Sequence, residues 1–109
     1  MVARVWHGFT TPENAEAYEA MLKPELLPGL SRTTGYRGSY LLRRAAGDEV
    51  EFITIIFWDS IDDIRALAGP DYTRAVVPEE RRRYLSRYDQ TAGHYDVASS
   101  QLPGAPGEK

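Results

Sequence analysis

The chain of 109 residues lacks cysteine altogether. Disulfides and thiolate metal sites are therefore excluded, and a reducing compartment, the cytoplasm, is the location that we expect. Long apolar runs are missing as well. Residues 1–7 show no basic segment followed by an apolar stretch, and no later stretch is long enough to cross a bilayer. We expect neither a signal peptide nor a membrane partner.

A strong excess of one charge is also absent, because 13 Lys and Arg stand against 16 Asp and Glu, a net charge of −3. The one basic cluster joins Arg81 to Arg83 with Arg87, directly after two glutamates and among apolar residues at helical spacing. No aromatic platform is interleaved with it, so it indicates a solvated helix face rather than a phosphate-binding patch. We expect no nucleic-acid partner.

The residues that are present describe one globular domain. Hydrophobic residues make up 42% of the chain and charged residues 27%, and the length suits a single unit. We assign residues 1–98 to this domain. Residues 99–109 are rich in Gly and Pro and have little apolar surface to offset the entropy of ordering, which predicts a disordered tail.

The first half of the domain predicts a strand and a helix. Residues 2–9 are rich in β-branched and aromatic types and predict a strand. Thr11 followed by Pro12 predicts a helix start, with Thr11 as the cap. Pro24 inside the helical pattern predicts either a kink or a second segment that ends at Pro28-Gly29. The apolar stripe of this helix consists of Ala15, Tyr18, Leu22 and Leu26.

Two further strands form a predicted hairpin. Residues 36–45 and 50–58 are extended segments on either side of the turn signal at 46–49. The second of them is apolar on both faces, unlike an antiparallel strand that faces water on one side. Both of its faces must therefore be covered. One face carries Phe52, Ile56 and Trp58, and the other carries Ile53, Ile55 and Phe57.

The rest of the domain predicts a second helix, one or two short helices and a last strand. Ser60 and Asp63 resemble a capping box, and the helix that they start ends at Gly69-Pro70. Residues 71–88 are predicted to hold the short helices, interrupted at Pro78, and residues 92–98 the last strand. The inward stripe of the second helix consists of Ile61, Ile64, Leu67 and Ala68.

The element order predicts an α+β domain, a ferredoxin-like split βαβ sandwich with helices on one face of a four-stranded antiparallel sheet. Two helices cover only one face of such a sheet. Because the strand at 50–58 is apolar on both, we expect a homodimer in which the second face packs against the sheet of another copy, a dimeric α+β barrel.

Four segments carry a family resemblance that covers residues 2–98: A-R-V-W-H-G-F-T, Y-L-L-R-R-x-x-G-D-E-V-E-F, F-W-D-S-I-D-D-I-R-A-L-A-G and H-Y-D-V. With them the chain resembles the antibiotic-biosynthesis-monooxygenase-like proteins of the dimeric α+β barrel superfamily. The resemblance implies a cavity between sheet and helices. It also implies oxidation of a small aromatic or polyketide-type substrate by molecular oxygen, with no metal or flavin cofactor.

The same resemblance suggests two substrate-binding residues. Trp58 at the end of its strand and Tyr72 after the second helix lie at places comparable to those of family side chains that hold the substrate. Haem-degrading relatives carry a His on the helix after the corresponding tryptophan region and an Asn on strand one. Here the segment D-Y-T-R-A-V-V-P has no His, and strand one has His7 instead of Asn, which argues against haem breakdown.

The two histidines are the candidate catalytic bases, because an imidazole exchanges protons near neutral pH. His94 is either such a base or a hydrogen-bonded strand residue. His7 is either a base or an interface residue. Adjacent strand residues point to opposite faces, so the member of the pair Trp6 and His7 that shares the Trp58 side is the better site candidate. We expect no metal, because no further ligand at fixed spacing accompanies the histidines.

Structural roles compete with these assignments. Trp58 fills space at the end of a buried strand, and Tyr72, like Tyr84 and Tyr88, can place an apolar ring in the core with its hydroxyl in water. The acidic residues Asp59, Asp62 and Asp63 indicate capping of the second helix. Two alternatives to the oxygenase remain open: a non-catalytic dimer that binds a small molecule or is associated with stress, and an isomerase or cyclase.

Overall fold

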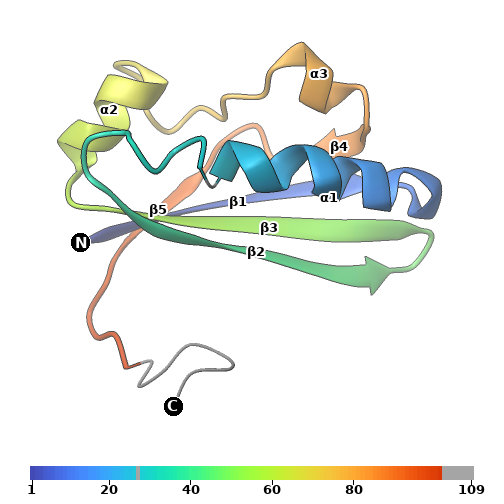
Figure 1. The fold of residues 1–109 in the computed structure, drawn as a ribbon, viewed down its shortest axis with the longest axis horizontal. Helices are drawn as coiled ribbons and strands as arrows, with labels where there is room; N and C mark the ends of the chain where they lie inside the picture. The colour runs from blue at the N-terminus through green and yellow to red at the C-terminus, as the bar shows by residue number, and fades with distance from the viewer. Residues whose placement is uncertain (27, 102–109) are drawn as a thin grey trace.

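The computed structural model describes residues 1–26 and 28–101 (Figure 1). Residues 102–109, most of the tail predicted to be disordered, lie outside the described residues. No helix within the described part is long and apolar enough to cross a bilayer. The elements are β1 Val2–Thr10, α1 Pro12–Leu26, β2 Tyr36–Ala46, β3 Glu49–Trp58, α2 Ile61–Ala68, α3 Glu79–Arg82, β4 Leu85–Tyr88 and β5 Gly93–Asp96.

The strands form one antiparallel sheet in the order β2-β3-β1-β4. The fifth strand, β5, pairs with the first half of β1, at Val2–Val5, while β4 pairs with its second half, at Gly8–Thr10. The split βαβ topology with β1 and β3 as central neighbours is therefore confirmed. The outermost position beside β1 is divided between two short strands.

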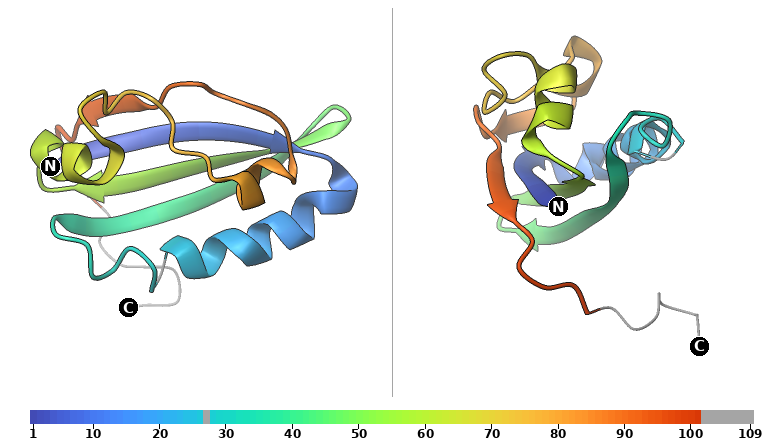
Figure 2. Two further views of the ribbon diagram at one scale, coloured as in Figure 1. Left: turned by 90° about the horizontal axis from the view of Figure 1, so that it is seen from above. Right: turned by 90° about the vertical axis from the view of Figure 1, so that its left-hand side faces the viewer.

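The helices lie on one face of this sheet, as predicted (Figures 1 and 2). In the left view of Figure 2, seen from above, α1 runs along one side of the sheet and α2 lies at one end of it. The segment after α2 crosses the sheet and leads to α3, which lies near α1. Two groups of buried side chains hold the layers together. One joins Tyr18 and Leu22 of α1 to Phe52, and the other joins Ile64 of α2 to Trp58.

The predicted caps are present. Thr11 Oγ1 accepts a hydrogen bond from Asn14 N at 3.3 Å, and Ser60 Oγ accepts one from Asp63 N at 3.3 Å. The first helix continues through Pro24 to Leu26, so the predicted alternative of a second segment that starts at the proline is wrong. The second helix ends at Gly69, whose φ of 97° favours glycine.

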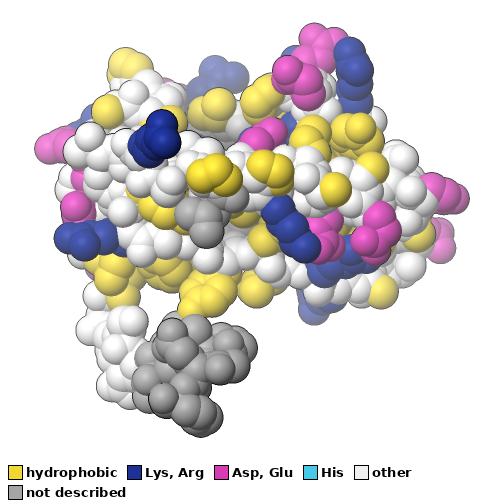
Figure 3. Space-filling model, in the orientation of Figure 1, with side chains coloured by type: hydrophobic (Ala, Val, Ile, Leu, Met, Phe, Trp, Pro, Cys, Tyr) yellow, Lys and Arg dark blue, Asp and Glu magenta, His cyan; other side chains and the backbone are white. Residues whose placement is uncertain are grey.

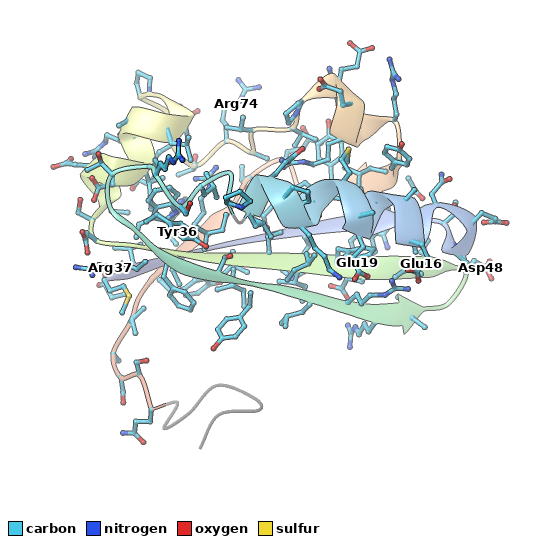
Figure 4. All side chains as sticks on the ribbon, viewed as in Figure 1. Glu16, Glu19, Tyr36, Arg37, Asp48 and Arg74 are labelled. Carbon is cyan, nitrogen blue, oxygen red and sulfur yellow. The ribbon has the colours of Figure 1, made fainter. Side chains whose placement is uncertain are left out.

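Charged pairs tie α1 to the hairpin. Glu16 and Glu19 extend from α1 beside the sheet (Figure 4), and both accept hydrogen bonds from Arg43 of β2, at 3.1 and 2.7 Å. The two-residue turn at Gly47 and Asp48 joins β2 to β3, with Gly47 at φ 64°. The short turn sets the register of β2 against β3, and in this register Arg43 pairs with Phe52 and lies on the helical face of the sheet.

The region 71–88 differs from the prediction. It holds one short helix, α3, directly after Pro78, and then the strand β4 where helix was expected. The basic cluster is divided accordingly: Arg81 lies on α3, and Arg87 lies on β4 over the ring of Phe9. Leu67 of α2, predicted to point inward, is 48% exposed.

The second face of the sheet carries the predicted apolar side chains. Ile53, Ile55 and Phe57 of β3 are only partly buried there, and Tyr40 and Leu42 of β2 are exposed beside them. Hydrophobic side chains gather along this side of the molecule, at the lower edge of Figure 3. The helices therefore cover one apolar face of β3 and leave the other open in the single chain.

Candidate functional site

A cavity of about 230 Å³ lies between the sheet and the helical layer. Its floor is formed by side chains of β1 and β3, and its walls by α1, α2 and the segment that leads to α3. Most of its lining is aliphatic, which suits a small apolar ligand. The lining residues are Arg4, Trp6, Leu22, Glu25, Leu26, Leu30, Thr54, Ile56, Leu67, Ala68, Ala75, Val76, Pro78 and Arg81.

The register of β1 against β3 sets the floor of the cavity. Trp6 lies opposite Thr54, and Arg4 lies opposite Ile56. All four residues line the cavity, because alternate residues of paired strands share one face. Trp6 therefore lies on the Trp58 side of the sheet and His7 on the other side. Of these two adjacent residues, Trp6 is the better candidate for the site in the cavity.

Trp6 is held firmly in the floor. Its Nε1 donates a hydrogen bond of 2.7 Å to the backbone oxygen of Asp89, and its ring packs at a tilt against Tyr88. Gly8, the next residue on the same face, leaves the room that this ring needs. A Cβ atom at Gly8 would lie 2.9 Å from the Trp6 ring, so a larger residue there would displace it.

Arg4 enters the lining from a fixed position. Its Nη1 donates to the backbone oxygen of Tyr72 at 2.5 Å and contacts His94 Nε2 at 2.9 Å. Its Nη2 donates to the backbone oxygen of Arg74 at 3.0 Å. Figure 4 shows Arg74 on the segment that passes above the sheet between α2 and α3. The side chain of Arg4 therefore ties β1 to this segment.

His94 is the partner of Arg4 across the β1–β5 pair. Arginine has no acceptor atom, so Nε2 must accept this hydrogen bond and the ring proton lies on Nδ1. Burial and the nearby charge of Arg4 lower the pKa of His94 from its usual 6.5, so the ring is neutral at physiological pH. His94 does not line the cavity, and its role as a base stays a prediction.

Trp58 and Tyr72 lie behind the cavity wall. Trp58 is completely buried and packs with Leu30, Ile56 and Ala68, which do line the cavity. Its Nε1 has no hydrogen-bond partner among the described residues. The ring of Tyr72 meets the His94 ring edge-on, with centroids 4.9 Å apart. Both residues pack behind side chains that line the cavity. Direct contact of either residue with a substrate stays a prediction.

His7 lies on the opposite, outer face of the sheet. Its Nδ1 is 3.0 Å from Asp89 Oδ2, and its Nε2 is 3.8 Å from Glu51 Oε2. Glu51 is buried and also accepts a hydrogen bond of 2.7 Å from Arg44. The structure therefore separates His7 from the four other predicted residues. Its alternative role, at an interface, stays a prediction.

A second pair of polar side chains, Glu25 of α1 and Arg81 of α3, lines the cavity where these two helices meet. Arg81 Nη2 donates to Glu25 Oε1 at 2.5 Å. The hydroxyl of Tyr18 and Nε of Arg81 are both buried without a hydrogen-bond partner in the described part of the chain. Burial raises the pKa of Tyr18 to about 12, so its hydroxyl keeps its proton.

Residues 1–26 and 28–101 contain no cluster of three or more His, Cys, Asp or Glu placed to hold a metal ion.

The sequence interpretation missed four polar residues of the lining: Arg4, Glu25, Thr54 and Arg81. A signal existed for Arg4. It precedes Trp6 by two residues on one strand, so the two share a face, and a charged residue on a helix-covered face is unusual. Glu25 and Arg81 come together through tertiary packing, for which their sequence separation gives no signal.

Structural comparison places this architecture among known folds. A Bacillus cereus protein proposed to be an antibiotic biosynthesis monooxygenase matches with a TM-score of 0.66 at 12% identity, over 93% of this chain and 94% of that one. The haem degrader MhuD of Mycobacterium tuberculosis, with two haems bound in its active site, gives 0.60 at 16% identity, over 94% and 100%.

A third similar structure is a mutant of SnoaB, a cofactor-independent oxygenase from Streptomyces nogalater. It gives a TM-score of 0.63 at 20% identity, over 91% of this chain and 95% of that one. No family model and no curated protein sequence matches the chain. The chain therefore has the ferredoxin-like α+β fold of the antibiotic-biosynthesis-monooxygenase-like proteins, and the resemblance predicted from the sequence is confirmed at the level of the fold.

Proposed function

We propose that this protein is a cofactor-independent, monooxygenase-like enzyme that oxidises a small aromatic or polyketide-type substrate in the cavity beside Trp6. The observation that carries the proposal is the cavity itself, which is mostly aliphatic, has an indole in its floor and contains a few polar groups. Such a lining suits a flat apolar molecule with a small number of polar atoms. The likeness to SnoaB supports the oxygenase chemistry.

The proposed reaction balances without a cofactor. Anthrone, a model substrate, loses a proton from its CH₂ carbon, and the carbanion reduces molecular oxygen. One oxygen atom becomes the new carbonyl of anthraquinone, and the other leaves as water with the two hydrogens of the CH₂ group. The apolar walls exclude water from the carbanion, which protects it from reprotonation.

Haem fits the cavity poorly. The side chains that hold haem iron in proteins are His, Cys, Met and Tyr. None of these residue types occurs among the described residues that line the cavity. The similarity to MhuD therefore supports a common fold and not haem chemistry in this cavity.

The direct test is product analysis with purified protein and anthrone, in air and under argon. The proposal predicts anthraquinone in air and none under argon, in protein treated with chelator and free of flavin. Turnover under argon would favour an isomerase or cyclase. The control variant is Arg37→Gln. It should keep the activity, because the side chain of Arg37 binds Asp59 and does not line this cavity.

One observation favours a second candidate function, binding without reaction. The described cavity lining contains no histidine, and the Nε2 lone pair of His94 is already used by Arg4. A binding protein would be stabilised thermally by an aromatic ligand and would form no product. Ligand-induced stabilisation with unchanged anthrone in air would therefore replace the oxygenase proposal with this one.

We also propose that the protein is a homodimer joined through the outer face of the sheet. Tyr40, Leu42 and Tyr95 are 43%, 45% and 60% exposed there, next to the partly buried row Ile53, Ile55 and Phe57. An apolar area of this kind is costly in water, at about 25 cal/mol per Å². A second copy with the same face would cover it on both chains.

A further inference from the structure

The charge of Arg4 has no counter-ion in the part of the chain that the structure describes. Its three hydrogen-bond partners are two backbone oxygens and the Nε2 atom of His94. The imidazole is neutral in this contact, because it accepts the hydrogen bond. None of the ion pairs between described residues includes Arg4.

The other charges in the cavity lining cancel. Besides Arg4, the charged lining residues are Glu25 and Arg81, which form an ion pair with each other. The lining therefore keeps one net positive charge, on Arg4. The chain as a whole carries −3, so the charge of the cavity has the opposite sign to that of the protein.

An isolated cation at this place is unfavourable. Arg4 is partly buried, and burial lowers its pKa, although guanidinium stays protonated at physiological pH. A buried charge is stable when an opposite charge and hydrogen bonds compensate its loss of hydration. The present partners use three of the five N–H groups of Arg4, so two remain for a ligand.

We infer that the cavity selects aromatic ligands that carry an anionic oxygen, as carboxylate, phenolate or enolate, and that Arg4 recognises this oxygen. The inference rests on the proposed function for the location of the ligand and adds its chemical class. The ring of the ligand lies in the aliphatic cavity beside Trp6, while its anionic oxygen meets the free N–H groups of Arg4. Charge-assisted hydrogen bonds of this kind are shorter and stronger than neutral ones.

A pair of isosteric probes tests the inference. 2-Naphthoate and 2-naphthamide have nearly the same shape, and only the first is an anion. Calorimetry should give a dissociation constant roughly tenfold lower for naphthoate than for naphthamide. Arg4→Gln should remove this preference, Arg4→Lys should keep part of it, and the control Arg37→Gln should leave it unchanged.

Each result bears on the inference. Equal affinities of the two probes for the wild-type protein, no measurable binding of either, or a full preference in a folded Arg4→Gln protein would overturn it. The wild-type comparison stands even if the variant does not fold. Anion-selective binding without oxidation of anthrone would uphold the inference and contradict the oxygenase proposal. Oxidation of anthrone with equal affinities for the two probes would uphold the oxygenase proposal and contradict the inference.

Discussion

The Nη1 atom of Arg4 lies 2.9 Å from Nε2 of His94, on two strands that pair at these two residues. Because arginine can only donate, this contact requires a neutral imidazole with its proton on Nδ1. His94 thus orients the cation of the cavity, and its protonation would place two positive charges against each other. The contact makes the site sensitive to acid.

We predict a pH-dependent stability that depends on His94. Burial and the charge of Arg4 lower its pKa in the folded state, so the unfolded chain binds the proton more readily. Neutral His94 therefore makes its full contribution to the free energy of unfolding above about pH 6.5, the pKa of a histidine in the unfolded chain. This contribution is lost as the pH falls through the lower pKa of His94 in the folded protein. Thermal unfolding at several pH values between about 5 and 8 measures this loss.

The variant that tests this pH dependence is His94→Gln. Its side-chain oxygen can accept a hydrogen bond from Arg4, and its side chain does not titrate. It should lose less stability than the wild-type protein between neutral and acid pH. His94→Leu should cost about 1 kcal/mol at neutral pH, because it removes the acceptor. Parallel pH profiles for the wild-type and His94→Gln proteins would show that His94 does not titrate against Arg4.

Tyr18→Phe should leave the stability unchanged or raise it by up to about 1 kcal/mol, since the hydroxyl is buried without a partner among the described residues. The control is Tyr36→Phe, which removes a hydroxyl that lies 2.9 Å from Ser39 Oγ and should cost stability. Chemical denaturation of both variants gives the comparison. A large destabilisation by Tyr18→Phe would mean that its hydroxyl has a partner, such as a buried water molecule.

Leu42→Glu should convert the proposed dimer into a monomer. Leu42 is 45% exposed on the outer face, and a carboxylate there would lie between two apolar sheets. Light scattering after size-exclusion chromatography measures the mass. Leu67→Glu is the control, because Leu67 is similarly exposed on the helical side and its replacement should leave the mass unchanged. A wild-type monomer at micromolar concentration would refute the dimer.

Ala75→Trp should fill the cavity and weaken the binding of 2-naphthoate by about tenfold or more. Ala75 lines the cavity from the segment between α2 and α3. Ala66→Trp on the exposed side of α2 is the control, and it should bind the probe as the wild-type protein does. Unchanged affinity in a folded Ala75→Trp protein would place the ligand elsewhere.

The sequence predicted the layers well because its periodic signals are strong. The apolar residues on both faces of β3 and the caps at Thr11 and Ser60 are local patterns, and each occurs in the structure. The β4 strand was missed since it has four residues, and Tyr84 and Tyr88 continue a helical spacing there. Its conformation is decided by pairing with β1, a tertiary contact.

The site was predicted less completely than the fold. Alternation along β1 showed that only one of Trp6 and His7 could face the helices, but the choice needed the register against β3. His94 was identified by residue type, while its partner Arg4 is 90 residues away in sequence. Polar groups that meet across such separations leave no periodic signal.

The central claim is that oxidation takes place in the cavity beside Trp6, and oxygen consumption measures it most directly. An oxygen electrode with chelator-treated wild-type protein and anthrone should record one O₂ per anthraquinone formed. Ala75→Trp should lose this activity while Ala66→Trp retains it. Equal oxygen consumption by a folded Ala75→Trp protein, or none by the wild-type protein, would contradict the account.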